Sequence, residues 1–189
     1  MSISYENLIQ TALTAGATKA VVIDVDRIVL SASFLDACKS NSCGNYGKCW
    51  ICPPDVGPIE EWMEKIRSFP RALFWQTIDD IEDSFDIEGM GEVSRHHIVT
   101  AQKLRRLLAD TLPAGMRTLH FACGGCSLCE RCAKRDNEPC RHPDLAMPSL
   151  EGSGVDVYKT TSGTGMKYVN GVNTVTYFGM ALFDDTEEN

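Results

Sequence analysis

The chain lacks any long hydrophobic run. No segment approaches the roughly 18 uninterrupted apolar residues that a membrane-spanning helix needs. The first sixteen residues, MSISYENLIQTALTAG, have neither the positive n-region nor the apolar stretch of a signal peptide. We therefore expect a soluble, cytoplasmic protein with no membrane partner.

Basic charge is also scarce. Eighteen Lys and Arg stand against 26 Asp and Glu, which gives a formal net charge of −8. This balance disfavours nucleic acid or an anionic membrane as the principal partner, and a basic protein or a small molecule fits better. The sequence also lacks an internal repeat and a low-complexity linker, so we predict one domain over residues 1–189.

The hydrophobic pattern predicts an α/β sandwich, a single domain with a roughly four-stranded sheet, helices and two cysteine-rich metal-binding loops. The continuous apolar character of residues 19–25 is typical of a central strand in a covered sheet. An acidic stretch, residues 79–92, is expected to be a surface loop. The other expected strands are 72–78, 117–121 and 174–183, and the expected helices are 4–15, a short one after Ser33, 58–67 and 92–110.

Nine cysteines require a chemical explanation. With 189 residues and 43% hydrophobic content, the chain can bury an ordinary core and does not need metal as its main stabiliser. Cytoplasmic thiols stay reduced, and an odd count suits a disulfide framework poorly. Metal or redox chemistry is the better interpretation.

The denser cysteine set lies within residues 123–143 and runs Cys123-x2-Cys126-x2-Cys129-x2-Cys132-x7-Cys140. Short C-x2-C-x2-C steps supply three thiolates from one turn, and a remote cysteine beside proline closes a 4Fe–4S site. We predict Cys126, Cys129, Cys132 and Cys140 as ligands. The neighbouring register, with Cys123 in place of Cys132, and a structural zinc site remain open.

The looser set lies within residues 38–54 and runs Cys38-x4-Cys43-x5-Cys49-x2-Cys52, followed by two prolines. We predict that these four cysteines form a second metal site. The spacing matches no standard motif, so zinc, or a mixture of structural and free thiols, remains open here.

Three segments carry a resemblance: CGNYGKCWICPP at 43–54, CSLCERCAKRDNEPCRHP at 126–143 and PSLEGSGVDV at 148–157. Together they resemble a cysteine-rich domain family of unknown function, described as predicted metal-binding proteins and regarded as an iron–sulfur family. The resemblance spans nearly the whole chain. It implies metal ligation by Cys38, Cys43 and Cys52 in the first motif and by Cys126, Cys129, Cys132 and Cys140 in the second.

Cys49 and Cys123 depart from the pattern of that family. If Cys49 does not bind, the first motif holds a cluster by three cysteines and leaves one iron open; if it binds, that cluster is closed. Whether Cys49 is a ligand therefore separates two classes of function.

Residues outside the thiols have candidate roles as well. Arg141 and His142 follow Cys140 and are placed to donate hydrogen bonds to cluster sulfur, with a solvated basic loop as the alternative. Glu151, Gly154 and Asp156 have the character of a helix start or a turn, and a catalytic carboxylate is the minor alternative.

The function predicted from these features is electron transfer by a protein with two 4Fe–4S clusters, acting with a redox partner protein. One alternative is an enzyme whose open iron binds substrate or sulfide, and another is a structural zinc module. Exposed cubane chemistry also predicts oxygen sensitivity, as in anaerobic metabolism. The oligomeric state, the potentials and the physiological donor do not follow from the sequence.

Overall fold

The computed structural model describes residues 3–185. Its first helix, α1 (Tyr5–Ala15), begins where the Ser4 side chain accepts a hydrogen bond from the Asn7 amide. It ends at Gly16, whose φ of +123° suits a residue without a side chain. The remaining helices are α2 (Phe34–Lys39), α3 (Ile59–Arg67), α4 (Ile87–Thr111) and α5 (Val157–Thr160), with short 3₁₀ turns at Val25–Arg27, Ala133–Asp136 and Glu151–Ser153.

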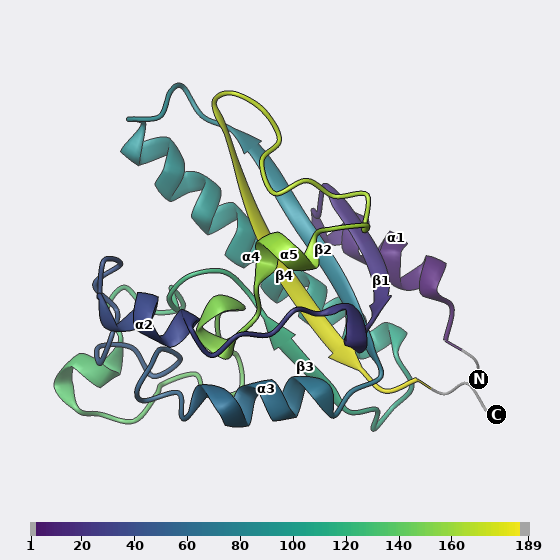
Figure 1. Cartoon of the computed structure of the whole chain (residues 1–189), viewed down its shortest axis with the longest axis horizontal. Coiled ribbons are helices and arrows are strands. Elements are labelled where there is room, and N and C mark those ends of the chain that lie inside the picture. The colour runs from purple at the N-terminus through teal and green to yellow at the C-terminus, as the bar shows by residue number, and fades with distance from the viewer. Residues whose placement is uncertain (1–2, 186–189) are drawn as a thin grey trace.

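A four-stranded antiparallel sheet forms the middle of the fold (Figure 1). The strands lie in the order β1-β2-β4-β3, and their bounds are Lys19–Asp24 for β1, Arg71–Asp80 for β2, Thr118–Phe121 for β3 and Thr174–Phe183 for β4. The prediction of an α/β fold with four strands is confirmed. The prediction that residues 19–25 form a central strand is wrong.

Strand β1 is an edge strand, which pairs with β2 alone. Its side chains nevertheless contribute to both faces: Val21 and Ile23 pack against one core, and Ala20 and Val22 against the other. A strand that is covered on both faces has a continuous run of apolar residues, whether it lies at the centre or at the edge of the sheet. The apolar run therefore does not show where in the sheet the strand lies.

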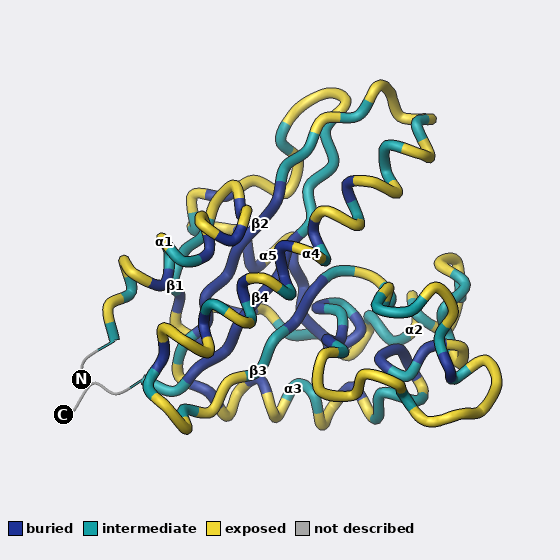
Figure 2. The backbone as a smooth tube through the Cα atoms, turned by 180° about the vertical axis from the view of Figure 1, so that it is seen from behind, coloured by how far each residue is buried: buried dark blue, intermediate teal, exposed yellow. Residues whose placement is uncertain are grey.

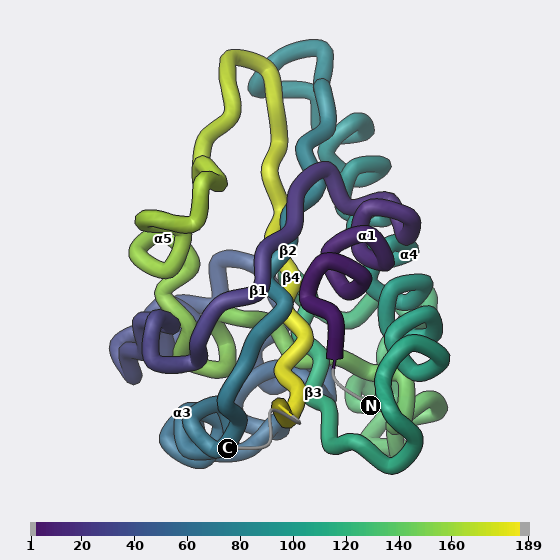
Figure 3. The backbone as a smooth tube through the Cα atoms, turned by 90° about the vertical axis from the view of Figure 1, so that its right-hand side faces the viewer, coloured from purple at the N-terminus to yellow at the C-terminus, as the bar shows by residue number. Residues whose placement is uncertain are grey.

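Helices cover both faces of the sheet, as the view along the layers shows (Figure 3). On one face α1 and α4 bury Leu8, Ala12 and Leu104 against Leu73 and Trp75. On the other face α3 and α5 bury side chains against Phe74, Phe178 and Met180. This arrangement gives two hydrophobic cores, one on each side of the sheet.

The acidic stretch 79–92 is shorter as a loop than predicted. Strand β2 continues to Asp80, and α4 already begins at Ile87. Asp86 is the reason for the early start, because its carboxylate accepts a hydrogen bond from the Gly89 amide at 2.8 Å and caps the helix. The buried stripe of α4 includes Val93, Ala101, Leu104 and Leu108.

The two cysteine loops lie side by side at one end of the molecule, beyond β3 and the start of α3 (Figures 1 and 2). Few of their residues are buried, whereas the sheet between the helices is buried along most of its length. Among the described residues, no helix is both long and apolar enough to cross a membrane.

Candidate metal centre

The first cysteine loop is shaped by residues that tolerate left-handed backbone. Asn41 has φ of +55°, and its side chain accepts a hydrogen bond from the Tyr46 amide at 3.0 Å. Gly47 has φ of +66° and donates its amide to the Pro53 carbonyl at 2.9 Å. These turns fold residues 41–54 back on themselves, so that Cys49 and Cys52 point inward and are buried.

The second cysteine loop leaves the sheet at the end of β3. Ala122 is held by a backbone hydrogen bond to Pro148, and Gly124 then turns the chain with φ of +61°. Cys132 precedes the 3₁₀ turn Ala133–Asp136, which ends at Asn137 in the left-handed region. The loop therefore projects from the sheet toward the first loop.

Polar side-chain interactions join the two loops. The Trp50 indole donates a hydrogen bond to the Glu138 carbonyl at 2.9 Å. The Lys134 ammonium lies 2.5 Å from the Asp55 carboxylate and 4.5 Å from the centroid of the Trp50 ring. The ion pair is well shielded, because the side chains of Lys134 and Asp55 are 19% and 15% exposed. Sequence reasoning missed this junction, since no pattern links residues about 80 positions apart.

Cys49 interacts with thiols of both loops. Its sulfur accepts hydrogen bonds from the Cys52 thiol, from the Ile51 and Cys126 amides and from the Cys132 thiol. The donors, with Cys52 first, lower the pKa of Cys49 to about 5, whereas donation to Cys49 raises the pKa of Cys52. Groups from both loops therefore favour the thiolate form of Cys49.

A cavity of about 560 Å³ opens beside Cys49. Four thiols line it, one from the first loop and three from the second: Cys49, Cys126, Cys129 and Cys132. Cys140 lies within electrostatic reach of Cys126 but does not line the cavity. The structure thus brings Cys49 to the second loop, whereas sequence order grouped it with Cys38, Cys43 and Cys52.

The other first-loop thiols form a looser group. Cys38, Cys43 and Cys52 interact electrostatically, and burial raises the pKa of Cys38. Cys43 is exposed. Cys123 does not line the four-thiol cavity; it lies beside Ile98, Gln102 and Met147 in a smaller one that Cys126 also lines, and burial raises the pKa of Cys123 to about 12.

All nine cysteines are free thiols. Within residues 3–185, the side chains form no group of three or more His, Cys, Asp or Glu already gathered for a metal ion. The donor chemistry nevertheless fits a thiolate-bound metal or cluster, because four thiols line one cavity and main-chain amides already donate to Cys49.

Arg141 and Asp156, two candidate residues besides the cysteines, both form hydrogen bonds. The Arg141 guanidinium donates a hydrogen bond to the Cys129 sulfur, while His142 is exposed. Asp156 accepts a hydrogen bond from the Lys159 amide at 3.0 Å and caps α5, and Gly154 turns with φ of +90°. These two residues start the helix, as their spacing indicated.

Glu151 lies in the 3₁₀ turn before α5, within electrostatic reach of Cys38 and Cys123. Burial raises the pKa of its carboxyl group. Its carboxyl group therefore influences two thiols that do not line the four-thiol cavity.

Comparison with known proteins gives one match. No curated protein and no solved structure matches the chain. The model of the predicted metal-binding protein family DUF2284 matches residues 21–183, a range that includes all nine cysteines and every strand except the first two residues of β1. The chain therefore belongs to this predicted metal-binding protein family.

Proposed function

We propose that the protein is an iron–sulfur protein that binds two 4Fe–4S clusters and exchanges electrons with a partner protein. The observation that carries the proposal is the shared cavity, where Cys49 from one loop meets Cys126, Cys129 and Cys132 from the other. A bound cluster would supply one-electron oxidation and reduction. We assign these four residues to the cavity site; Cys140, which the sequence predicted as a ligand, does not line the cavity.

The chain's own groups tune such a site. Hydrogen bonds to ligand sulfur favour the more negative, reduced state and raise its potential. The Cys126 amide donates to Cys49 and the Arg141 guanidinium donates to Cys129. The family match supports metal binding, and the choice of iron–sulfur chemistry rests on the number and spacing of the thiols.

A second candidate function follows from the position of Cys49 beside the thiols of the second loop. If Cys49 serves the cavity site, the first loop retains three thiols: Cys38, Cys43 and Cys52. A cluster held by three cysteines leaves one iron free to bind substrate or sulfide, as a Lewis acid does. This arrangement would make the protein an enzyme at the first loop and a carrier at the cavity.

The first test is the metal content of protein purified without oxygen. We expect about eight iron and eight acid-labile sulfide per chain, two clusters of four each. Zinc alone, with neither iron nor sulfide, would overturn the proposal and favour the structural zinc module. Loss of iron and of the visible absorption in air would confirm the expected oxygen sensitivity.

Single substitutions then assign the ligands. Cys49→Ser should remove about half of the iron, and Cys123→Ser, the matched control outside the cavity, should keep all of it. Full iron in Cys49→Ser would exclude Cys49 as a ligand. Added cyanide should change the paramagnetic spectrum only if one iron is open, which separates enzyme from carrier.

A further inference from the structure

Charge is distributed unevenly along this acidic chain. The cysteine loops, residues 38–54 and 123–143, contain six Lys and Arg and three Asp and Glu. The stretch 79–92, at the junction of β2 and α4, contains seven acidic residues and no basic one. Counted over Lys, Arg, Asp and Glu alone, the cysteine loops carry a charge of +3, whereas the whole chain carries −8.

Part of this basic charge surrounds the thiol cavity. Lys48, Arg131 and Arg135 line its mouth, together with Glu130, and all four side chains are exposed. Arg131 pairs with Asp136 at 2.8 Å within its own loop. Neither Lys48 nor Arg135 forms an ion pair with any residue in the part of the chain that the structure describes.

Lys48 and Arg135 thus place two exposed positive charges, with no ion pair among the described residues, at the opening of a cavity that four thiols line. Such an arrangement attracts negative charge over a distance of about 10 Å at moderate salt. It also differs in sign from the rest of the surface, so it orients an approaching acidic protein as well as attracting it.

We propose that the basic mouth, defined as Lys48, Arg131 and Arg135, is the docking face for a small acidic electron-carrier protein. This inference rests on the proposed redox function and identifies the partner of the cavity site. The net charge of the chain suggested a basic partner protein, whereas the basic residues at the cavity favour an acidic one. The charge close to a binding site affects docking more than the net charge of the whole chain does. The carrier loses one electron and the cavity site gains it, so no further reactant is required.

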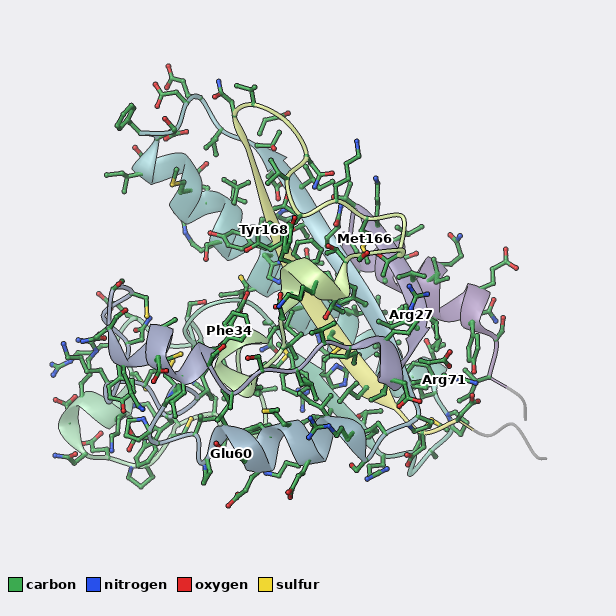
Figure 4. All side chains as sticks on the ribbon, in the orientation of Figure 1. Arg27, Phe34, Glu60, Arg71, Met166 and Tyr168 are labelled. Atoms are coloured by element: carbon green, nitrogen blue, oxygen red, sulfur yellow. The ribbon has the colours of Figure 1, made fainter. Side chains whose placement is uncertain are left out.

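The docking face is tested by calorimetry on anaerobically purified protein, with a small acidic ferredoxin as the probe. At low salt, Lys48→Glu and Arg135→Glu should each raise the dissociation constant about tenfold. Lys167→Glu makes the same charge change on an exposed residue next to Met166, far from the cysteine loops (Figure 4), and should change it less than twofold. Near 1 M salt, where the screening length falls to about 3 Å, the variants should converge.

Electron transfer gives a second measurement. The rate of reduction by the ferredoxin should fall with the same two substitutions, whereas reduction by a viologen radical cation should not slow. Iron content of each variant, measured in parallel, shows that the thiol site is intact.

Several outcomes would overturn the docking face. They are an equal effect of Lys167→Glu, affinity that does not depend on salt, or competition by inorganic phosphate at constant ionic strength, which would indicate a small-anion site instead. Absence of iron in the wild-type protein would overturn the proposed function, and it would be seen before any binding is measured. The two failures are therefore distinguishable.

Discussion

The α/β body and the cysteine end of this molecule are stabilised in different ways. The body buries large side chains on both faces of the sheet, with Phe74 and Trp75 at 0% and 1% exposure. The cysteine end has a small apolar cluster built on Cys49, Ile51 and Cys52, and polar interactions such as the Lys134–Asp55 pair join its loops. Apolar burial is therefore concentrated in the body, and we expect metal binding to make the loops of the cysteine end rigid.

The largest expected effect comes from removing the metal. After anaerobic chelation, amides in residues 38–57 and 123–146 should lose their protection against hydrogen exchange, because few apolar contacts hold these loops. Amides of β2 and β4 should stay protected by the two cores. Mass spectrometry of both segments measures the contrast, and loss of protection throughout the chain would show that the two regions fold as one unit.

The next effect tests the packing of the body. A Cβ added at Gly179 would lie 2.2 Å from the Trp75 ring, so Gly179→Ala should lower the free energy of unfolding by up to about 3 kcal/mol. Iron content should not change, because the site lies in the other region. Chemical denaturation measures the loss.

Gly91→Ala is the matched control for this substitution. Gly91 lies within α4, and a Cβ there meets nothing within 4 Å. The same change should therefore stabilise the protein by about 0.5–1 kcal/mol. A similar loss from both variants would contradict the close fit between Gly179 and Trp75.

A third effect concerns pH. His97 is fully buried, stacks on Trp75 at 4.6 Å and lies 3.0 Å from the Thr77 hydroxyl. Burial lowers the pKa of His97 from 6.5 to about 3. Between these values the unfolded chain binds a proton that the folded chain does not, so stability falls as pH falls, by about 2 kcal/mol at pH 5 relative to neutral pH.

Denaturation at a series of pH values measures this loss. His97→Gln should flatten the dependence between pH 6.5 and pH 4, whereas His142→Gln, at an exposed position in the cysteine end, should leave it unchanged. An unaltered slope in His97→Gln would assign the loss to other groups, of which His120, with a pKa lowered by burial to about 4, is the next to test.

The smallest effect probes the junction of the two loops. A double-mutant cycle over Asp55→Ala and Lys134→Ala should give a coupling of about 1 kcal/mol in the local opening of the cysteine end. The same cycle on Arg131 and Asp136, whose side chains are 63% and 42% exposed, should give close to zero. Equal couplings would show that shielding does not set the strength of the Asp55–Lys134 pair.

Much of the body was predictable because each of its elements carries a local signal. The apolar stripe of α4 repeats with the helical period, and residues 174–183 alternate between two buried faces of the sheet. The early start of α4 was missed, since Asp86 is one acidic residue among seven in residues 79–92, and its capping role depends on backbone geometry. The edge position of β1 was missed because its apolar residues show that both faces of the strand are covered. They do not show whether the strand has one neighbouring strand or two.

Two cysteine loops, enough apolar residues for a core and an α/β order of elements could all be predicted before the structure was known. Those properties follow from local spacing and composition. The folded chain alone shows that Cys49 lies with Cys126, Cys129 and Cys132, and that Lys48 and Arg135 line the same cavity. Distance along the chain does not report distance in space, and the contact between the two loops exists only after the sheet has brought them to one end.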